Sequence, residues 1–289
     1  MRLLRVSESG EFSLTKDLHR NIPRYAILSH TWRDDDEEEE VTFGDMTEGL
    51  GQAKVGYSKI RFCAKQAIRD GLQHIWVDTC CIDKSSSAEL SEAITSMFHW
   101  YRNAIKCYVY LEDVSMNTYD QMDQSFWEPA FRRSRWFTRG WTLQELIAPT
   151  SVEFFSSEGQ HLGDKQSLER QLHEITKIKI EALQGHGLSE FSIDERFSWA
   201  DNRETKREED KAYSLLGIFN IFMSPHYGEG AEHALQVIDN GTLPWDTPTA
   251  LIGRRESGVH ASYNIAELIN IGPYPIRPGT ILINPAGGM

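Results

Sequence analysis

Short apolar runs alternate with helical patterns along the first 160 residues of the chain. Four runs are predicted as buried strands: RYAILS at 24–29, HIWVDTCCID at 74–83, KCYVYLEDV at 106–114 and SVEFF at 151–155. Strands that alternate with helices of about ten to fifteen residues usually pair in parallel. The pattern therefore predicts an α/β core over about residues 20–160, with a mainly parallel, doubly wound sheet flanked by helices.

Two segments carry the helix signals of this core. YSKIRFCAKQAIRD at 57–70 has apolar residues at helical spacing and ends at Gly71, a residue typical of helix ends. SSSAE at 85–89 offers a serine N-cap and an acidic first turn, and the periodic run LSEAITSMFHWYRNA extends to residue 104.

Beyond residue 165 the sequence becomes amphipathic. SLERQLHEITKI at 167–178 predicts a helix, ERFSWADNRETKREEDKAYSLLGIF at 195–219 a short segment, a charged turn and a second helix, and HYGEGAEHALQ at 226–236 a turn that leads into another helix. These segments indicate a helical extension over about 165–236. Residues 237–289 are rich in Gly and Pro and are predicted to form a tail or linker.

Polar residues close each predicted strand. In a doubly wound sheet the ligand crevice lies outside the carboxyl ends of the parallel strands, so these residues are expected to share one rim. Strand ends also carry polar residues by default, which leaves a purely structural role open for each of them. The rim residues are Ser29, His30, Trp32, Asp78, Thr79, Asp83, Glu112 and Asp113.

The segment RWFTRGWTLQELIAP at 135–149 places Glu145 on a short aromatic-rich helix that must stop at Pro149. Aromatic rings, arginines and a carboxylate together suit a nucleotide, because they offer stacking, phosphate binding and an acceptor for ribose hydroxyls. In the alternative interpretation, Trp141 faces the core and Glu145 points to solvent.

Composition narrows the function classes. A formal net charge of −13 and a pI near 5.2 argue against nucleic acid as a partner, because such proteins usually carry a basic stripe. An apolar run of about 18 residues is absent, and so is an apolar segment after Arg2 and Arg5. We expect neither a membrane span nor a secretory signal, and a cytoplasmic location.

The four cysteines, Cys63, Cys80, Cys81 and Cys107, lie in apolar surroundings and suit reduced thiols. CxxC and HExxH motifs are absent, so no metal site is expected. Cys80 or Cys81 with His30 or His99 as a base would make a Cys-dependent hydrolase, but adjacent cysteines in an apolar run are more often packed thiols.

Several segments together resemble the ordered motifs of the fungal heterokaryon incompatibility (HET) domain. The resemblance covers about residues 3–236 and implies a fungal cytosolic protein that triggers programmed cell death on sensing non-self. The segments are YAILSHTW at 25–32, WVDTCCIDK at 76–84, SAELSEAITSMFHWYRNA at 87–104, CYVYLEDV at 107–114, RGWTLQELIAP at 139–149, SWADNRETKREEDKAYSLLGIF at 198–219 and YGEG at 227–230.

The HET family is in turn distantly similar to TIR domains, which implies a TIR-like, flavodoxin-like fold. WTLQEL at 141–146 resembles the TIR motif WCLxEL, whose glutamate is essential for NAD cleavage, so this role maps onto Glu145. YAILSHTW resembles the first-strand motif, with His30 where many TIR domains carry an aromatic residue. Thr142 likewise replaces the usual Cys.

The resemblance implies an NAD glycohydrolase that acts on self-association, with NAD as substrate, no required cofactor and a possible upstream receptor. Glu145 would be catalytic. The residues expected to contact NAD are Ser29, His30, Trp32, Asp78, Asp83, Arg139 and Trp141. Asp78 and Asp83 equally suit structural roles at a strand end and a turn. A non-catalytic module for homotypic signalling remains the alternative.

Overall fold

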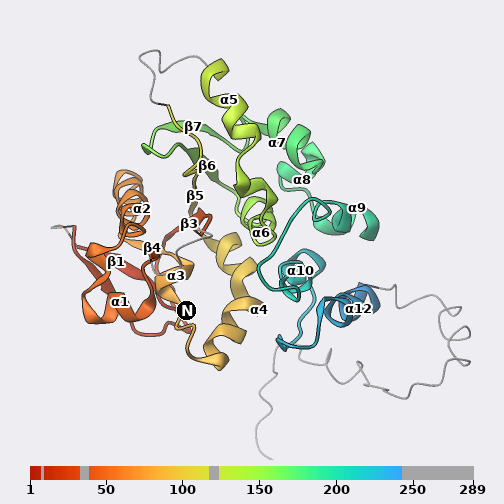
Figure 1. Cartoon of the computed structure of the whole chain (residues 1–289), viewed down its shortest axis with the longest axis horizontal. Helices are drawn as coiled ribbons and strands as arrows, with labels where there is room; N and C mark the ends of the chain where they lie inside the picture. The colour runs from red at the N-terminus through yellow and green to blue at the C-terminus, as the bar shows by residue number, and fades with distance from the viewer. Residues whose placement is uncertain (8–9, 33–38, 117–123, 243–289) are drawn as a thin grey trace, which may run out of the picture. The chain divides into compact units, whose positions relative to one another are not determined.

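The computed structural model describes residues 1–7, 10–32, 39–116 and 124–242. Residues 1–243 form one compact unit, which Figure 1 shows. Of the tail predicted at 237–289, residues 237–242 instead continue a helix, α12 (Ala231–Thr242), and the rest lies outside the described residues, as does most of the acidic tract at 34–40.

A sheet of seven strands runs through this unit in the order β2-β1-β4-β3-β5-β6-β7. The strands are β1 (Leu4–Val6), β2 (Phe12–Leu14), β3 (Ala26–His30), β4 (His74–Trp76), β5 (Lys106–Tyr110), β6 (Val152–Phe155) and β7 (His161–Asp164).

The four central strands are parallel: β3 pairs with β4 and β5, and β5 pairs with β6. The α/β prediction is therefore confirmed, and β3 and β4 are neighbours near the centre of the sheet. The whole sheet is mixed, because β1, β2 and β7 add antiparallel edges that the apolar pattern did not predict. Those edge strands are only three or four residues long, too short for a periodic signal.

Helices cover both faces of the central strands. α2 (Tyr57–Arg69) contacts β3, β4 and β5, whereas α6 (Thr142–Ile147) contacts β3 and packs against α4 (Ser87–Asn103). In Figure 1, α2 lies on one side of the strands and α4 and α6 lie on the other. This double cover explains why β3 is buried along its entire length.

The predicted strand at 74–83 is wrong in its second half. β4 ends at Trp76, and α3 (Asp78–Cys81) begins two residues later, with the amide of Cys81 donating to the carbonyl of Val77 at 2.8 Å. A continuous apolar run does not distinguish a buried strand from a buried helical turn. Cys80 and Cys81 therefore lie in a helical turn and not in the predicted strand.

Helical structure follows β7, as predicted. Trp199, Tyr213 and Leu216 are buried in it, and the expected second helix is split into α10 and α11 at Ser214 and Leu215. The elements are α7 (Glu169–Thr176), α8 (Ile180–Leu183), η4 (Leu188–Glu190), α9 (Ile193–Ser198), α10 (Asp210–Tyr213), α11 (Leu216–Phe219) and α12 (Ala231–Thr242).

The remaining helical elements are short and lie in connections. They are α1 (Phe43–Glu48), η2 (Gly51–Ala53), α5 (Gln124–Arg132) and η3 (Arg135–Thr138).

Candidate functional site

The topology itself defines where a ligand crevice belongs. In chain order the four parallel strands β3, β4, β5 and β6 lie in the order 2-1-3-4, so the connections diverge between β3 and β5. In a doubly wound sheet the ligand crevice lies at this switch point, outside the carboxyl ends of the strands. Ser29 and His30 end β3 at that place, and α6 follows η3 in the connection between β5 and β6.

Glu145, Ser29 and Trp136 form a hydrogen-bonded chain across this switch point. The Ser29 hydroxyl donates to Glu145 Oε2, and the Trp136 indole donates to Ser29 Oγ at 2.8 Å. Ser29 on β3 thus meets residues of η3 and α6 that lie more than 100 positions later in the sequence. The Cys107 thiol on β5 also approaches the Glu145 carbonyl at 3.8 Å.

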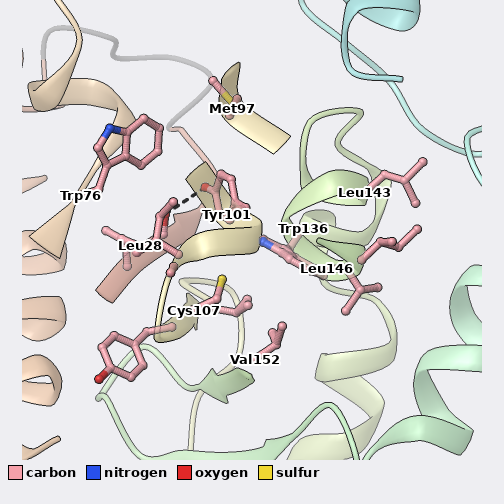
Figure 2. Close-up of a cluster of buried hydrophobic side chains, with 14 of the residues drawn as sticks. Leu28, Trp76, Met97, Tyr101, Cys107, Trp136, Leu143, Leu146 and Val152 are labelled. Atoms are coloured by element: carbon pink, nitrogen blue, oxygen red, sulfur yellow. Dashed lines mark hydrogen bonds between the residues drawn. The ribbon is translucent and has the colours of Figure 1, made fainter. Parts of the chain in front are cut away.

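The environment of Glu145 is apolar and closed. The residue is 7% exposed, which shows that the alternative interpretation, in which Glu145 points to solvent, is wrong. Figure 2 shows its helical neighbours Leu143 and Leu146 beside Trp136 and Cys107 in the buried cluster. Burial raises the pKa of Glu145 to about 8, despite the hydrogen bond from Ser29.

His30, Trp32 and Asp78 form a second cluster beside the first. Neighbouring residues of a strand point to opposite faces, so His30 lies on the other side of β3 from Ser29. Asp78 Oδ1 lies 3.1 Å from His30 Nε2, and Asp78 Oδ2 accepts from Trp32 Nε1 at 2.9 Å. Burial alone would raise the pKa of Asp78, but the Lys84 charge and the His30 and Trp32 contacts hold it well below its usual range.

Buried charges fix the chain that leads out of β3. Lys59 Nζ on α2 donates to the Thr31 carbonyl at 3.1 Å and to Glu40 Oε1 at 2.6 Å, and Arg135 donates to the Trp32 carbonyl at 2.9 Å. The backbone beside the rim is therefore held from two sides.

The other predicted contact residues lie in different surroundings. Trp141 Nε1 donates to Asp210 Oδ2 at 3.2 Å, so its indole faces the helical extension. The Asp83 carboxylate accepts from the Ser85 amide and hydroxyl in the turn before α4, which agrees with the alternative structural role. Arg139 is half-buried, and its backbone pairs with Glu204. The structure thus brings Ser29 to Glu145 and joins His30, Trp32 and Asp78.

Arg203 was missed by the sequence analysis. Its buried guanidinium donates to the Arg139 carbonyl at 2.9 Å and to Thr142 Oγ1 at 2.8 Å, at the start of the helix that carries Glu145. Its charge acts against the rise in the pKa of Glu145, and burial lowers its own pKa to about 9. The sequence analysis predicted a charged turn for the segment around Arg203. Of its neighbours, only Trp199 indicated that this segment is buried.

The structure gives little support for a cysteine nucleophile or a metal site. Burial raises the pKa of Cys63, Cys80 and Cys107, so these thiols stay protonated and are poor nucleophiles. Among the described residues, no three His, Cys, Asp or Glu side chains are grouped so that they would hold a metal ion. The described helices also include none with the length and apolar character to cross a membrane.

An open hollow of about 470 Å³ lies between α7, α8 and η4, lined by His173, His186 and Glu190 among others. It shares no lining residue with the switch point.

Comparison with known proteins defines the class. The chain belongs to the heterokaryon incompatibility family: the model for "Heterokaryon incompatibility protein (HET)" matches residues 25–130, which hold β3, β4, β5 and the His30 to Asp78 cluster.

A relative extends the match over most of the chain. The chain is 58% identical over 237 residues to vegetative incompatibility protein HET-E-1 of Podospora anserina, which covers 82% of this chain. The chain spans 17% of the length of that relative. No solved structure matches the chain.

Proposed function

We propose that this domain acts in heterokaryon incompatibility as a cell-death effector that cleaves the nicotinamide–ribose bond of NAD when copies of it associate. The observation that carries the proposal is the position of Glu145. A single carboxyl group, linked to Ser29 at the end of β3, lies at the switch point of a doubly wound sheet, where ligands of such sheets bind.

The proposed reaction requires few catalytic groups from the protein. The bond between the nicotinamide nitrogen and the anomeric carbon breaks, and both electrons leave with the nitrogen, so the pyridinium departs as neutral nicotinamide without a proton. The ribose carbon passes through an oxocarbenium-like state, as in glycoside hydrolysis. Water then adds to this carbon and releases a proton. Glu145 would hold the ribose hydroxyls and offset the positive charge on the carbon.

The raised pKa of Glu145 fits this role through the charge of the substrate. A pKa of about 8 leaves the acid mostly neutral at pH 7 in the closed site. A pyridinium cation close to the carboxyl group favours its ionised form and lowers this pKa. The carboxylate would therefore form when the cationic substrate arrives.

Burial of Glu145 links activity to assembly. At 7% exposure the carboxyl group is not open to a molecule of the size of NAD, so α6 or the end of β3 must move for substrate to enter. We propose that self-association, under an upstream receptor, supplies this change. The TIR-like character of the fold and the cytoplasmic location belong to the same proposal. The cysteines are unpaired, which suits a reducing compartment.

The same burial favours one alternative, a non-catalytic module that relays a signal by homotypic contacts. In that case Glu145 is a neutral structural acid whose hydrogen bond to Ser29 fastens α6 to β3. No ligand enters the switch point.

A concentration series distinguishes the two. Purified protein is incubated with NAD at several protein concentrations, and free nicotinamide is followed by chromatography. The proposal predicts that the release rate per protein molecule rises with protein concentration, because association opens the site. No release at any concentration, including after artificial clustering, would favour the non-catalytic module.

A further inference from the structure

The ammonium group of Lys84 lies over the indole of Trp32. Lys84 Nζ is 3.6 Å from the centroid of the ring and 3.7 Å from Asp78 Oδ2. An aromatic face beside a carboxylate attracts a cation through both the ring quadrupole and the negative charge. The two groups therefore form a cation site, which a side chain of the protein itself fills in this structure.

We infer that Lys84 occupies the place of a cationic ligand, and that an N-substituted pyridinium displaces its ammonium group from Trp32 and Asp78. This inference rests on the proposed function, since the nicotinamide end of NAD is such a pyridinium. It assigns Lys84 as a built-in competitor of the substrate and Trp32 with Asp78 as the groups that recognise the charge of the ring.

The protein groups that form this cation site are held in place. The Trp32 indole is fixed by the hydrogen bond that it donates to Asp78 Oδ2 at 2.9 Å. Asp78 is fixed in turn by His30 Nε2, which lies 3.1 Å from Asp78 Oδ1. The Arg135 guanidinium holds the carbonyl of Trp32. A ring and a carboxylate that are already in place bind a cation without the entropic cost of ordering them.

Lys84 is held more loosely than the groups beneath it. Its side chain is 34% exposed, and its 3.7 Å distance from Asp78 is too long for a hydrogen bond. Partial burial lowers the pKa of Lys84, which shows that the ammonium group loses hydration there. Because the Lys84 side chain is flexible and lies too far from Asp78 for a hydrogen bond, its ammonium group can move away toward solvent.

A pyridinium fits the vacated place better than the ammonium does. It is planar, so it can stack on the indole, and its charge is spread over the ring and is weakly hydrated. Asp78 also adds to the rise in the pKa of Glu145, so a cation at Asp78 lies within the electrostatic reach of the proposed catalytic acid.

Binding of 1-methylnicotinamide tests the inference, because this pyridinium carries no ribose bond to cleave. We expect Lys84→Met to bind it about tenfold more tightly than the wild-type chain in calorimetric titration. Neutral nicotinamide should bind equally to both proteins, since it has no charge for Trp32 and Asp78 to attract. Lys84→Gln serves as a second variant of the same change.

Two controls separate the site from a general charge effect. Lys179→Met removes a lysine paired with Glu195 on the surface and should leave the affinity at the wild-type value. Trp32→Leu in the Lys84→Met background should lose the gain. Equal affinity in Lys84→Met and the wild type, or an equal gain in Lys179→Met, would overturn the inference.

The outcome is independent of catalysis. Tighter pyridinium binding by Lys84→Met without any NAD cleavage would keep the cation site and remove the proposed reaction. Nicotinamide release from NAD without tighter pyridinium binding by Lys84→Met would support the proposed reaction and overturn the cation site.

Discussion

Glu145 is an acid held in its neutral form by its surroundings. Transfer of a carboxylate from water into an apolar interior costs more than one hydrogen bond from Ser29 returns, and the negative charge of Asp78 adds to that cost. The nearby charge of Arg203 recovers only part of it. A further cation close to this carboxyl group would favour its ionised form.

The first prediction concerns the pH dependence of stability. The folded-state pKa of about 8 lies above the ordinary glutamate value of 4.5, so the contribution of Glu145 is fully present below about pH 4.5 and is lost as pH rises toward 8. The free energy of unfolding of the wild type should fall relative to that of Glu145→Gln by about 1.4 kcal/mol per pH unit in this window. Urea unfolding from pH 5 to pH 9 measures the difference.

Glu158→Gln provides a control of opposite sign. Burial alone would raise the pKa of Glu158, but hydrogen bonds from Ser115, Ser156 and the Met116 amide lower it to about 2. Its contribution is therefore fully present above about pH 4.5 and is lost only as pH falls toward 2, so the curves of the wild type and Glu158→Gln should stay parallel from pH 5 to pH 9. Parallel curves for the wild type and Glu145→Gln between pH 5 and 8 would show that Glu145 ionises freely in the folded protein.

At the scale of the element, α6 is a six-residue helix that depends on contacts at both ends. Arg203 donates to Thr142 Oγ1 and the Arg139 carbonyl at its start. Lys165 donates to the carbonyls of Leu146 at 3.3 Å and Pro149 at 2.6 Å at its end. A helix this short has little stability of its own, so these two buried cations set where Glu145 lies.

The second prediction follows from the contacts of Arg203. Arg203→Gln should destabilise the fold by about 2–3 kcal/mol, because it removes charge-assisted hydrogen bonds from buried acceptors. It should also move the pH midpoint of nicotinamide release upward, since the charge that lowers the pKa of Glu145 is gone. Arg203→Lys keeps the charge and should restore the midpoint while recovering only part of the stability.

Arg196→Gln is the matched control for Arg203. Arg196 also lies in the helical extension, where it donates to the Ile218 carbonyl at 3.1 Å and packs over Phe219. Its loss should leave the pH midpoint unchanged. An unchanged midpoint in Arg203→Gln as well would show that Arg203 has only a structural role.

Sequence patterns predicted the central elements because each has a strong local signal. β3 and β5 are continuous apolar runs, α2 has helical periodicity and Gly71 after it, and α4 is capped at its start by Ser86, whose side chain accepts from the Glu89 amide. The edge strands β1 and β2 are too short for such a signal. The turn from β4 into α3 looks like a longer strand because both are buried and apolar.

The sequence could predict only those site residues whose positions follow from the strand topology. Ser29 and Asp78 follow from the carboxyl ends of the parallel strands β3 and β4, and knowledge of strand order is enough to place them at one edge of the sheet. The partner of Trp141 could not be predicted, because Asp210 reaches it from a helix about 70 positions later. Burial of Glu145 depends in the same way on the packing of the helical extension.

At the scale of the whole molecule, the helical extension holds the proposed catalytic helix against the sheet. The backbone of Glu204 pairs with that of Thr138 and Gly140, at 2.6 and 2.8 Å, just before α6. Asp210 accepts hydrogen bonds from both Trp141 and Tyr227, so the YGEG turn at 227–230 connects to the same point. A displacement of this extension would move α6, which offers a route from association to an open Glu145.

The most direct test of the account compares the clustered wild type with clustered Glu145→Gln for release of nicotinamide from NAD. The account predicts release by the wild type and a rate lower by about a hundredfold to a thousandfold in Glu145→Gln, the usual effect of losing one electrostatic contact to the transition state. Glu153→Gln, at a half-buried carboxylate on β6 paired with Lys106, should cleave at the wild-type rate. Equal rates in the wild type and a folded Glu145→Gln would contradict the account.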